Sequence, residues 1–174
     1  FDPQFYLAYF QLGVLQKKQG QSKASIASLN KVLDIRPDHD KTWFTLGSVH
    51  ETDGNNDIAI EHYSKAIEIN PGYSKAYGSL GKLYTEKQEF KKAEDILKTV
   101  VQIDSEYANG FMRLGLLYIE LENFKDAANN LKVSTDLDDK DHNKYFNLAS
   151  AYNHLEKWDE AANAAQSCID LKKK

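Results

Sequence analysis

The chain has 174 residues, 28% of them charged and 41% hydrophobic, which are the proportions of a folded protein rather than a disordered one. Its 22 basic and 26 acidic residues give a net charge of -4, which argues against the basic surface that nucleic acid needs. No run approaches the roughly 18 consecutive apolar residues of a membrane span, so we expect no transmembrane segment. Cys168 is the single cysteine, which excludes an intrachain disulfide and a cysteine metal cluster.

Residue 1 is Phe rather than Met, so a leader could have been removed. The compartment therefore stays open, with the cytoplasm as the default.

A leucine followed by a small residue recurs every 34 residues along the chain. The pairs are Leu12-Gly13, Leu46-Gly47, Leu80-Gly81, Leu114-Gly115 and Leu148-Ala149. An aromatic residue stands three residues before each leucine, at Tyr9, Trp43, Tyr77, Phe111 and Tyr145. Because spacings of three and four place side chains on one helical face, each unit is predicted to contain an amphipathic helix.

A second apolar set with the same spacing follows in every unit, for example Ala59, Tyr63 and Ala66. Short polar segments separate the two sets, and short segments with Pro or polar residues separate the units, as at Arg36-Pro37-Asp38. Connections this short make successive helices antiparallel neighbours. Each unit is therefore predicted to be a pair of antiparallel helices.

These residues resemble the tetratricopeptide repeat (TPR) family, whose 34-residue pattern is W-x2-L-G-x2-Y, then A-x3-F, then P. The resemblance covers nearly the whole chain, in five repeats over 6–39, 40–73, 74–107, 108–141 and 142–174, with 1–5 as the tail of a preceding repeat. It implies a single domain over 1–174 with an all-α fold, a right-handed solenoid of helical hairpins known as the TPR superhelix. Departures include Ser25 where the family has Ala, and His50 where it has Tyr.

Both ends of this array lack the polar capping helix that terminal repeats usually carry. The last predicted helix has a face of small residues, Ala161, Ala164, Ala165 and Cys168, that would seat another helix. We therefore expect either a piece of a longer solenoid or self-association through uncapped ends.

The sequence offers no catalytic constellation. The phosphate-loop, dinucleotide, metalloprotease and nucleophile-elbow motifs are all missing, and the five His residues are scattered over three of the units without ligand spacing. We therefore predict no enzyme activity, no cofactor and no metal site.

The resemblance implies that the inward side of each first helix lines a concave groove that holds a partner segment. The candidate residues are Phe10, Val14, Lys41, Phe44, Lys75, Gly78, Lys82, Asn109, Met112, Arg113, Leu116, Asn143 and Phe146. Such a mixture of apolar and basic side chains suits a peptide with apolar anchors and an acidic residue. Gly78 is unusual inside a helix, and either opens a pocket for a ligand side chain or allows close packing.

Two peptide specificities known in the family are disfavoured. The carboxylate clamp of chaperone-binding members needs Lys and Asn on one first helix, Asn on the next, and Lys with Arg on the third. The first three repeats here offer Phe10 and Val14, then Thr45, then Lys75 and Ser79, of which only Lys75 fits. The clamp also fails in the later repeats, although Asn109 and Arg113 in the fourth retain anion-binding character. An asparagine ladder along the groove is absent as well. The predicted function is a non-catalytic adaptor or scaffold. The alternatives are the substrate-recruiting arm of a larger enzyme, or a structural subunit that uses its convex face or ends.

Overall fold

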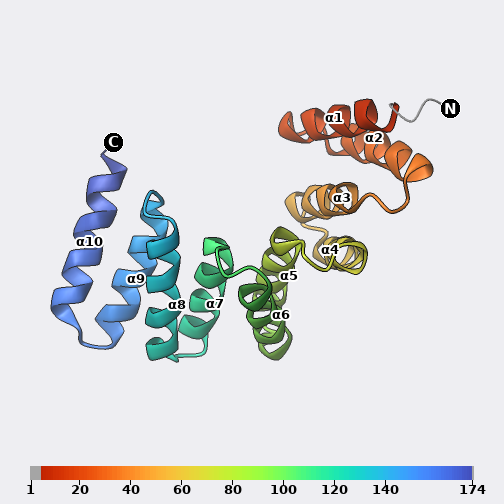
Figure 1. Ribbon diagram of the computed structural model, residues 1–174. Helices are drawn as coiled ribbons and strands as arrows, with labels where there is room; N and C mark the ends of the chain where they lie inside the picture. The colour runs from red at the N-terminus through yellow and green to blue at the C-terminus, as the bar shows by residue number, and fades with distance from the viewer. Residues whose placement is uncertain (1–4, 174) are drawn as a thin grey trace. The chain divides into compact units, whose positions relative to one another are not determined.

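The computed structural model describes residues 5–173, and within this range every regular element is an α-helix. The ten helices of the described range are α1 (Phe5–Lys18), α2 (Ser22–Ile35), α3 (Asp40–Thr52), α4 (Asn56–Ile69), α5 (Ser74–Glu86), α6 (Phe90–Ile103), α7 (Ala108–Glu120), α8 (Phe124–Leu137), α9 (His142–His154) and α10 (Trp158–Lys172) (Figure 1). The prediction of an all-α fold is confirmed. The predicted tail over 1–5 lies outside the described residues except for Phe5.

The chain divides into two compact units, with the division between Leu80 and Gly81 inside α5. The first unit contains the packed pairs α1/α2 and α3/α4 and the first part of α5. The second contains the rest of α5, then α6, and the packed pairs α7/α8 and α9/α10. The repeat boundaries and the single domain over 1–174 remain predictions.

The two helices of a pair meet where the recurring glycine stands. A Cβ added at Gly47 would lie 2.7 Å from the ring of Tyr63, and one added at Gly115 would lie 2.6 Å from Leu131 Cγ. Tyr63 and Leu131 are fully buried, as their spacing along the second helix predicts. Since interiors are packed to near-crystalline density, only a residue without a side chain permits this approach.

Ser25, the departure from the family pattern, is buried in the same kind of contact. Its hydroxyl donates a 2.7 Å hydrogen bond to the carbonyl of Gly13 on the paired helix. The polar atom is thereby satisfied, so serine replaces alanine here without an unpaired buried group.

The turn inside each helix pair contains one residue in the left-handed region. These residues are Gly20, Gly54, Gln88, Glu122 and Glu156, with φ of 72°, 78°, 59°, 55° and 56°. They recur with the repeat period, so the same turn geometry is used in every pair, with glycine at only two of the positions. A side chain in this region costs conformational energy that glycine avoids.

Candidate protein-interaction surfaces

In the first unit, the predicted groove aromatics take part in packing. Phe10 packs against the buried cluster of Leu29, Leu46 and Val49, and its ring meets His39 edge-on with centroids 5.1 Å apart. Phe10 therefore stabilises the junction of α1, α2 and α3, and only part of its ring faces solvent.

Phe44 is held in the same way, between two tyrosines of the first unit. Its ring centroid lies 5.4 Å from that of Tyr63 and 5.0 Å from that of Tyr73. The Tyr63 hydroxyl donates to Glu51 Oε2 at 2.5 Å, and burial together with this bond raises the pKa of Tyr63. Phe44 is thus part of an aromatic cluster, and a charge placed there would disturb the fold.

The remaining candidates of the first unit differ in exposure. Lys41 and Lys75 are exposed, Val14 is half-buried and Gly78 is buried. Beside Val14, Lys17 Nζ donates to Ser48 Oγ at 2.5 Å and so joins α1 to α3. Partial burial lowers the pKa of Lys17, and the nearby Glu51 carboxylate acts in the opposite direction.

In the second unit, three predicted residues line one small depression of about 90 Å³. Its lining consists of Lys82, Thr85, Glu86, Arg113 and Leu116. Lys82 forms an ion pair with Glu86 at 3.2 Å, one helical turn further along α5. Arg113 Nε is buried and has no hydrogen-bond partner among the described residues. The depression therefore combines an apolar wall with a guanidinium that can still donate a hydrogen bond to an anion.

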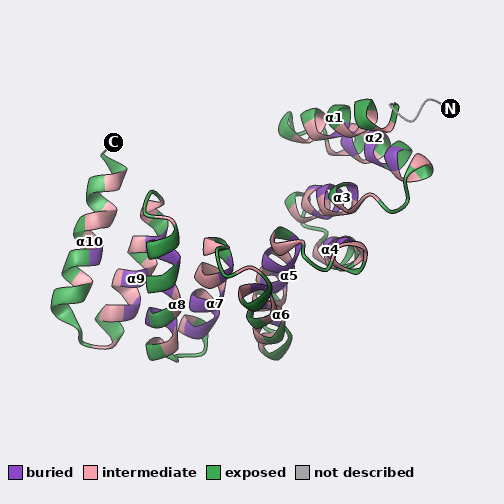
Figure 2. Cartoon of the chain, viewed as in Figure 1, coloured by how far each residue is buried: buried purple, intermediate pink, exposed green. Residues whose placement is uncertain are grey.

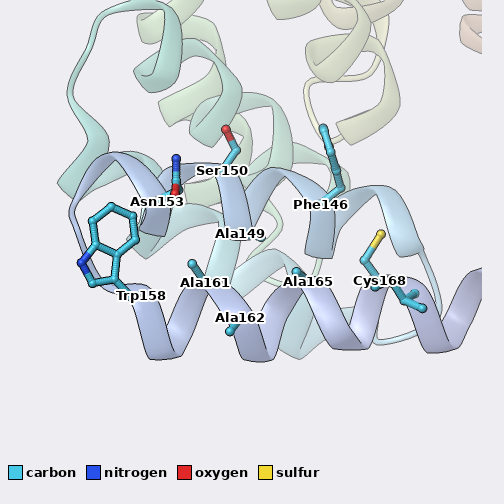
Figure 3. Close-up of a pocket in the computed structure, with 10 residues that line it drawn as sticks. Phe146, Ala149, Ser150, Asn153, Trp158, Ala161, Ala162, Ala165 and Cys168 are labelled. Atoms are coloured by element: carbon cyan, nitrogen blue, oxygen red, sulfur yellow. The ribbon is translucent and has the colours of Figure 1, made fainter.

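A larger cavity of about 580 Å³ lies between α9 and α10 (Figure 3). Its lining consists of Phe146, Ala149, Ser150, Asn153, Trp158, Ala161, Ala162, Ala165, Cys168 and Ile169. Figure 3 shows small alanines along α10, with Trp158 near one end and Cys168 near the other. Ala161, Ala165 and Cys168 of the small-residue face line this cavity, whereas Ala164 lines a different one.

That second cavity, of about 300 Å³, lies among α8, α9 and α10. It contains Tyr145, Tyr152 and the ion pair of Lys132 with Asp136, whose charged atoms are 2.5 Å apart. Sequence reasoning did not find it, because its lining comes from three helices and no motif marks their meeting.

Within 5–173, no group of three or more His, Cys, Asp or Glu residues is placed to hold a metal ion. In the same range, none of the helices combines the length and the apolar character needed to cross a membrane.

Family models decide what kind of protein this is. Three models, each described as a tetratricopeptide repeat, match residues 6–39, 50–112 and 112–169. The chain belongs to the tetratricopeptide repeat family. The TPR fold indicates a protein–protein interaction module, and TPR proteins are generally non-catalytic. No curated protein sequence matches the chain.

Solved structures share this fold at low sequence identity. PilF of Pseudomonas aeruginosa is 20% identical with a TM-score of 0.88, over 97% of this chain and 77% of that one. MamA (41-end) from Desulfovibrio magneticus RS-1 is 17% identical with a TM-score of 0.80, over 99% and 97%. YrrB, described as a TPR protein with an unusual peptide-binding site, is 16% identical with a TM-score of 0.70, over 95% and 86%. The prediction of a TPR solenoid fold is confirmed.

Proposed function

We propose that this TPR protein is a non-catalytic adaptor or scaffold that holds a peptide segment of a partner protein against the inward sides of its first helices. The observation that carries the proposal is the depression of Lys82, Arg113 and Leu116 in the second unit. Residues of two different repeats meet there, as a groove that follows successive repeats requires.

The chemistry of this depression defines the partner segment. A carboxylate accepts two parallel hydrogen bonds from a guanidinium, and this pairing is stronger than a neutral hydrogen bond. Arg113 is half-buried and lines the depression, so its guanidinium can donate to an acidic side chain of the peptide. Leu116 lies next to Arg113 on the same helix face and offers an apolar contact. The partner segment therefore contains an acidic residue beside an apolar residue that serves as an anchor.

Further candidates extend the groove within each unit. Lys41 and Lys75 are exposed in the first unit and carry the same charge as Arg113, which favours an acidic segment. Asn109, Met112, Asn143 and Phe146 add polar and apolar contacts in the second unit. YrrB, a TPR protein with an unusual peptide-binding site, is a precedent for a peptide ligand on this fold.

The test is a pull-down from a lysate of the source organism with a groove variant, Arg113→Gln with Leu116→Gln. The matched control, Lys125→Gln with Leu137→Gln, removes a cation and a leucine at exposed positions of α8 in the second unit. Both variants are first compared by circular dichroism and thermal unfolding. A partner that is lost with the groove variant and kept with the control supports the proposal.

Partners that remain on the groove variant contradict the proposal. If they are then lost when Tyr145 or Tyr152 is replaced, the cavity among α8, α9 and α10 is the binding surface. A catalytic protein retained with either variant would identify the chain as the recruiting arm of an enzyme.

A further inference from the structure

The structure contains an internal example of a helix seated in the groove of the preceding helix pair. Leu46 and Val49 of α3 are buried in one cluster with Leu29 of α2, and Phe10, Ile26 and Leu33 pack around them. We define Phe10, Ile26, Leu29 and Leu33 as the cradle of the first pair. It receives two apolar side chains that lie three residues apart on one helix face.

The cavity between α9 and α10 is lined by the residues equivalent to the cradle, four repeat periods further along the chain. Phe146, Ala162, Ala165 and Ile169 occupy the positions of Phe10, Ile26, Leu29 and Leu33, and all four line that cavity. We call these four residues the socket. Unlike the cradle, the socket is open, with Phe146 65% and Ile169 47% exposed, and α10 is exposed over much of its surface (Figure 2).

Helix α1 exposes the residues that are equivalent to the two side chains filling the cradle. Leu12 and Leu15 of α1 stand one period before Leu46 and Val49, and they are 44% and 54% exposed, whereas Leu46 and Val49 are each 1% exposed. Phe5 lies on the same face, two turns before Leu12, and is exposed as well. We call Phe5, Leu12 and Leu15 the knob.

We propose that the knob of one copy of this chain docks into the socket of a second copy, so that α1 packs on α9 and α10 as α3 packs on α1 and α2. Such a contact joins two different surfaces, so it is heterologous and passes from copy to copy, ending in a closed ring or an open chain. It shares Phe146 with the proposed peptide groove but lies apart from the depression at Arg113, and it does not depend on the proposed peptide binding.

The sizes of the side chains agree with this docking. The socket has Ala162 and Ala165 where the cradle has Ile26 and Leu29, so it has more room. The knob in turn has Leu15 where α3 has the smaller Val49. The larger side chain on one surface would take up part of the wider space on the other, which is the direction that close packing favours.

The proposed docking would also bring aromatic residues together near both ends of α1. Each of these contacts between copies has a counterpart within the chain. His39 meets Phe10 edge-on in the first unit, and the corresponding pair between copies is Phe5 on Phe146. In the second unit Phe124 stacks on His154, with ring centroids 4.1 Å apart. The corresponding pair between copies is Trp158 with Lys18, a favourable combination of a cation and an aromatic face.

The two helices that would meet carry opposite net charge. Helix α1 carries Lys18 and no acidic residue, while its Lys17 donates a hydrogen bond to Ser48 of α3. Helix α10 carries Asp159, Glu160 and Asp170 against the single Lys172. Opposite charge favours the encounter of knob and socket, and it opposes pairing of two identical α1 or two identical α10 surfaces.

Sedimentation velocity over micromolar to millimolar concentrations tests the proposal. The wild-type chain is expected to form a concentration-dependent series of oligomers. A knob variant, Leu12→Glu with Leu15→Glu, and a socket variant, Ala162→Glu with Ile169→Glu, are each expected to weaken association by about tenfold or more. The control, Ile58→Glu with Ile103→Glu, changes exposed residues of similar exposure elsewhere and is expected to associate as the wild type does.

Mixing the two variants separates this contact from any symmetric one. The knob variant keeps its socket and the socket variant keeps its knob, so the mixture is expected to form a one-to-one dimer and nothing larger. In a Trp43→Phe background, the emission of Trp158 is expected to shift to shorter wavelength as that dimer forms. All variants are compared by circular dichroism, since the substituted positions are exposed or half-exposed and tolerate a charge.

Three results would overturn the proposal. The first is a wild-type chain that stays monomeric at every concentration, which would leave the socket to a helix of another protein. The second is a mixture of variants that stays monomeric while the wild type associates. The third is a knob variant that associates as strongly as the wild type.

Discussion

The ammonium group of Lys144 donates a hydrogen bond to the Asp138 carboxylate at the start of the last repeat. Among residues 5–173, Lys144 is the charged side chain that is fully buried, 1% exposed, whereas Asp138 is 41% exposed. The hydrogen bond from Lys144 holds the pKa of Asp138 below its usual range. One end of the pair is therefore desolvated while solvent reaches the other.

Asp138→Asn is expected to lower the free energy of unfolding by about 1–3 kcal/mol, because the buried ammonium loses its counter-charge and solvent at Asp138 offsets part of the loss. Chemical denaturation at neutral pH measures it. Since the folded pKa of Asp138 is lowered, the contribution of the pair is present above the unfolded pKa near 4 and is lost as the pH falls through the folded pKa. The variant should therefore differ from the wild type less at low pH.

Lys144→Met is the companion experiment. It removes the buried charge and leaves Asp138 able to be hydrated, so it is expected to be neutral or stabilising. A loss as large as that of Asp138→Asn would show that the ion pair itself stabilises the fold beyond its desolvation cost.

The left-handed turns allow a stabilising substitution. Glu122 has φ of 55° and occupies the position that Gly20 and Gly54 hold in earlier turns. Glu122→Gly is expected to stabilise the protein by about 0.5–1 kcal/mol, because relief of the left-handed strain exceeds the entropy cost of glycine. Thermal unfolding measures the change. The reverse substitution, Gly54→Glu, is expected to destabilise, and equal effects of the two would contradict the explanation.

His50 is expected to make stability depend on pH. Its Nδ1 is buried without a hydrogen-bond partner among the described residues, and its ring lies 5.2 Å from that of His62. Burial, aided by His62, lowers the pKa of His50 below its usual value near 6.5. Stability is thus present above the unfolded pKa and lost as the pH falls toward the folded pKa.

His50→Phe is expected to flatten the loss of stability between about pH 7 and pH 5. Urea unfolding at several pH values measures the slope. Some slope should persist, because burial also lowers the pKa of His39. An unchanged slope would show that His50 accepts a proton as easily in the folded state as in the unfolded chain.

Whether a helix contact requires glycine depends on the size of the residue that faces it on the paired helix. Gly115→Ala would place a Cβ 2.6 Å from Leu131 Cγ, so we expect a net loss of about 1–2 kcal/mol from overpacking. In the last repeat the same two positions hold Ala149 and Ala165, a smaller pair. The double variant Gly115→Ala with Leu131→Ala is expected to show favourable coupling in a double-mutant cycle, and additive effects would contradict this explanation.

Much of the fold could be predicted because it is local and repeated. Leu46 with Gly47, and the apolar set of Ala59, Tyr63 and Ala66, occur at helical spacing and recur with one period. Any chain with this pattern must pair its helices to bury them. The position of the depression was partly predictable for the same reason, since Lys82 and Leu116 are separated by one period on the same side of successive first helices.

The sequence by itself therefore determined the helix pairs, their all-α TPR fold and the set of side chains on each helix face. Only the tertiary structure decided what those side chains do. Phe10 and Phe44 pack into clusters, and Arg113 Nε is buried without a partner in the described range. Leu12 and Leu46 hold the same repeat position, yet one is exposed and the other buried. The reason is that helix periodicity is a property of the local chain, whereas burial depends on whether another helix lies against that face.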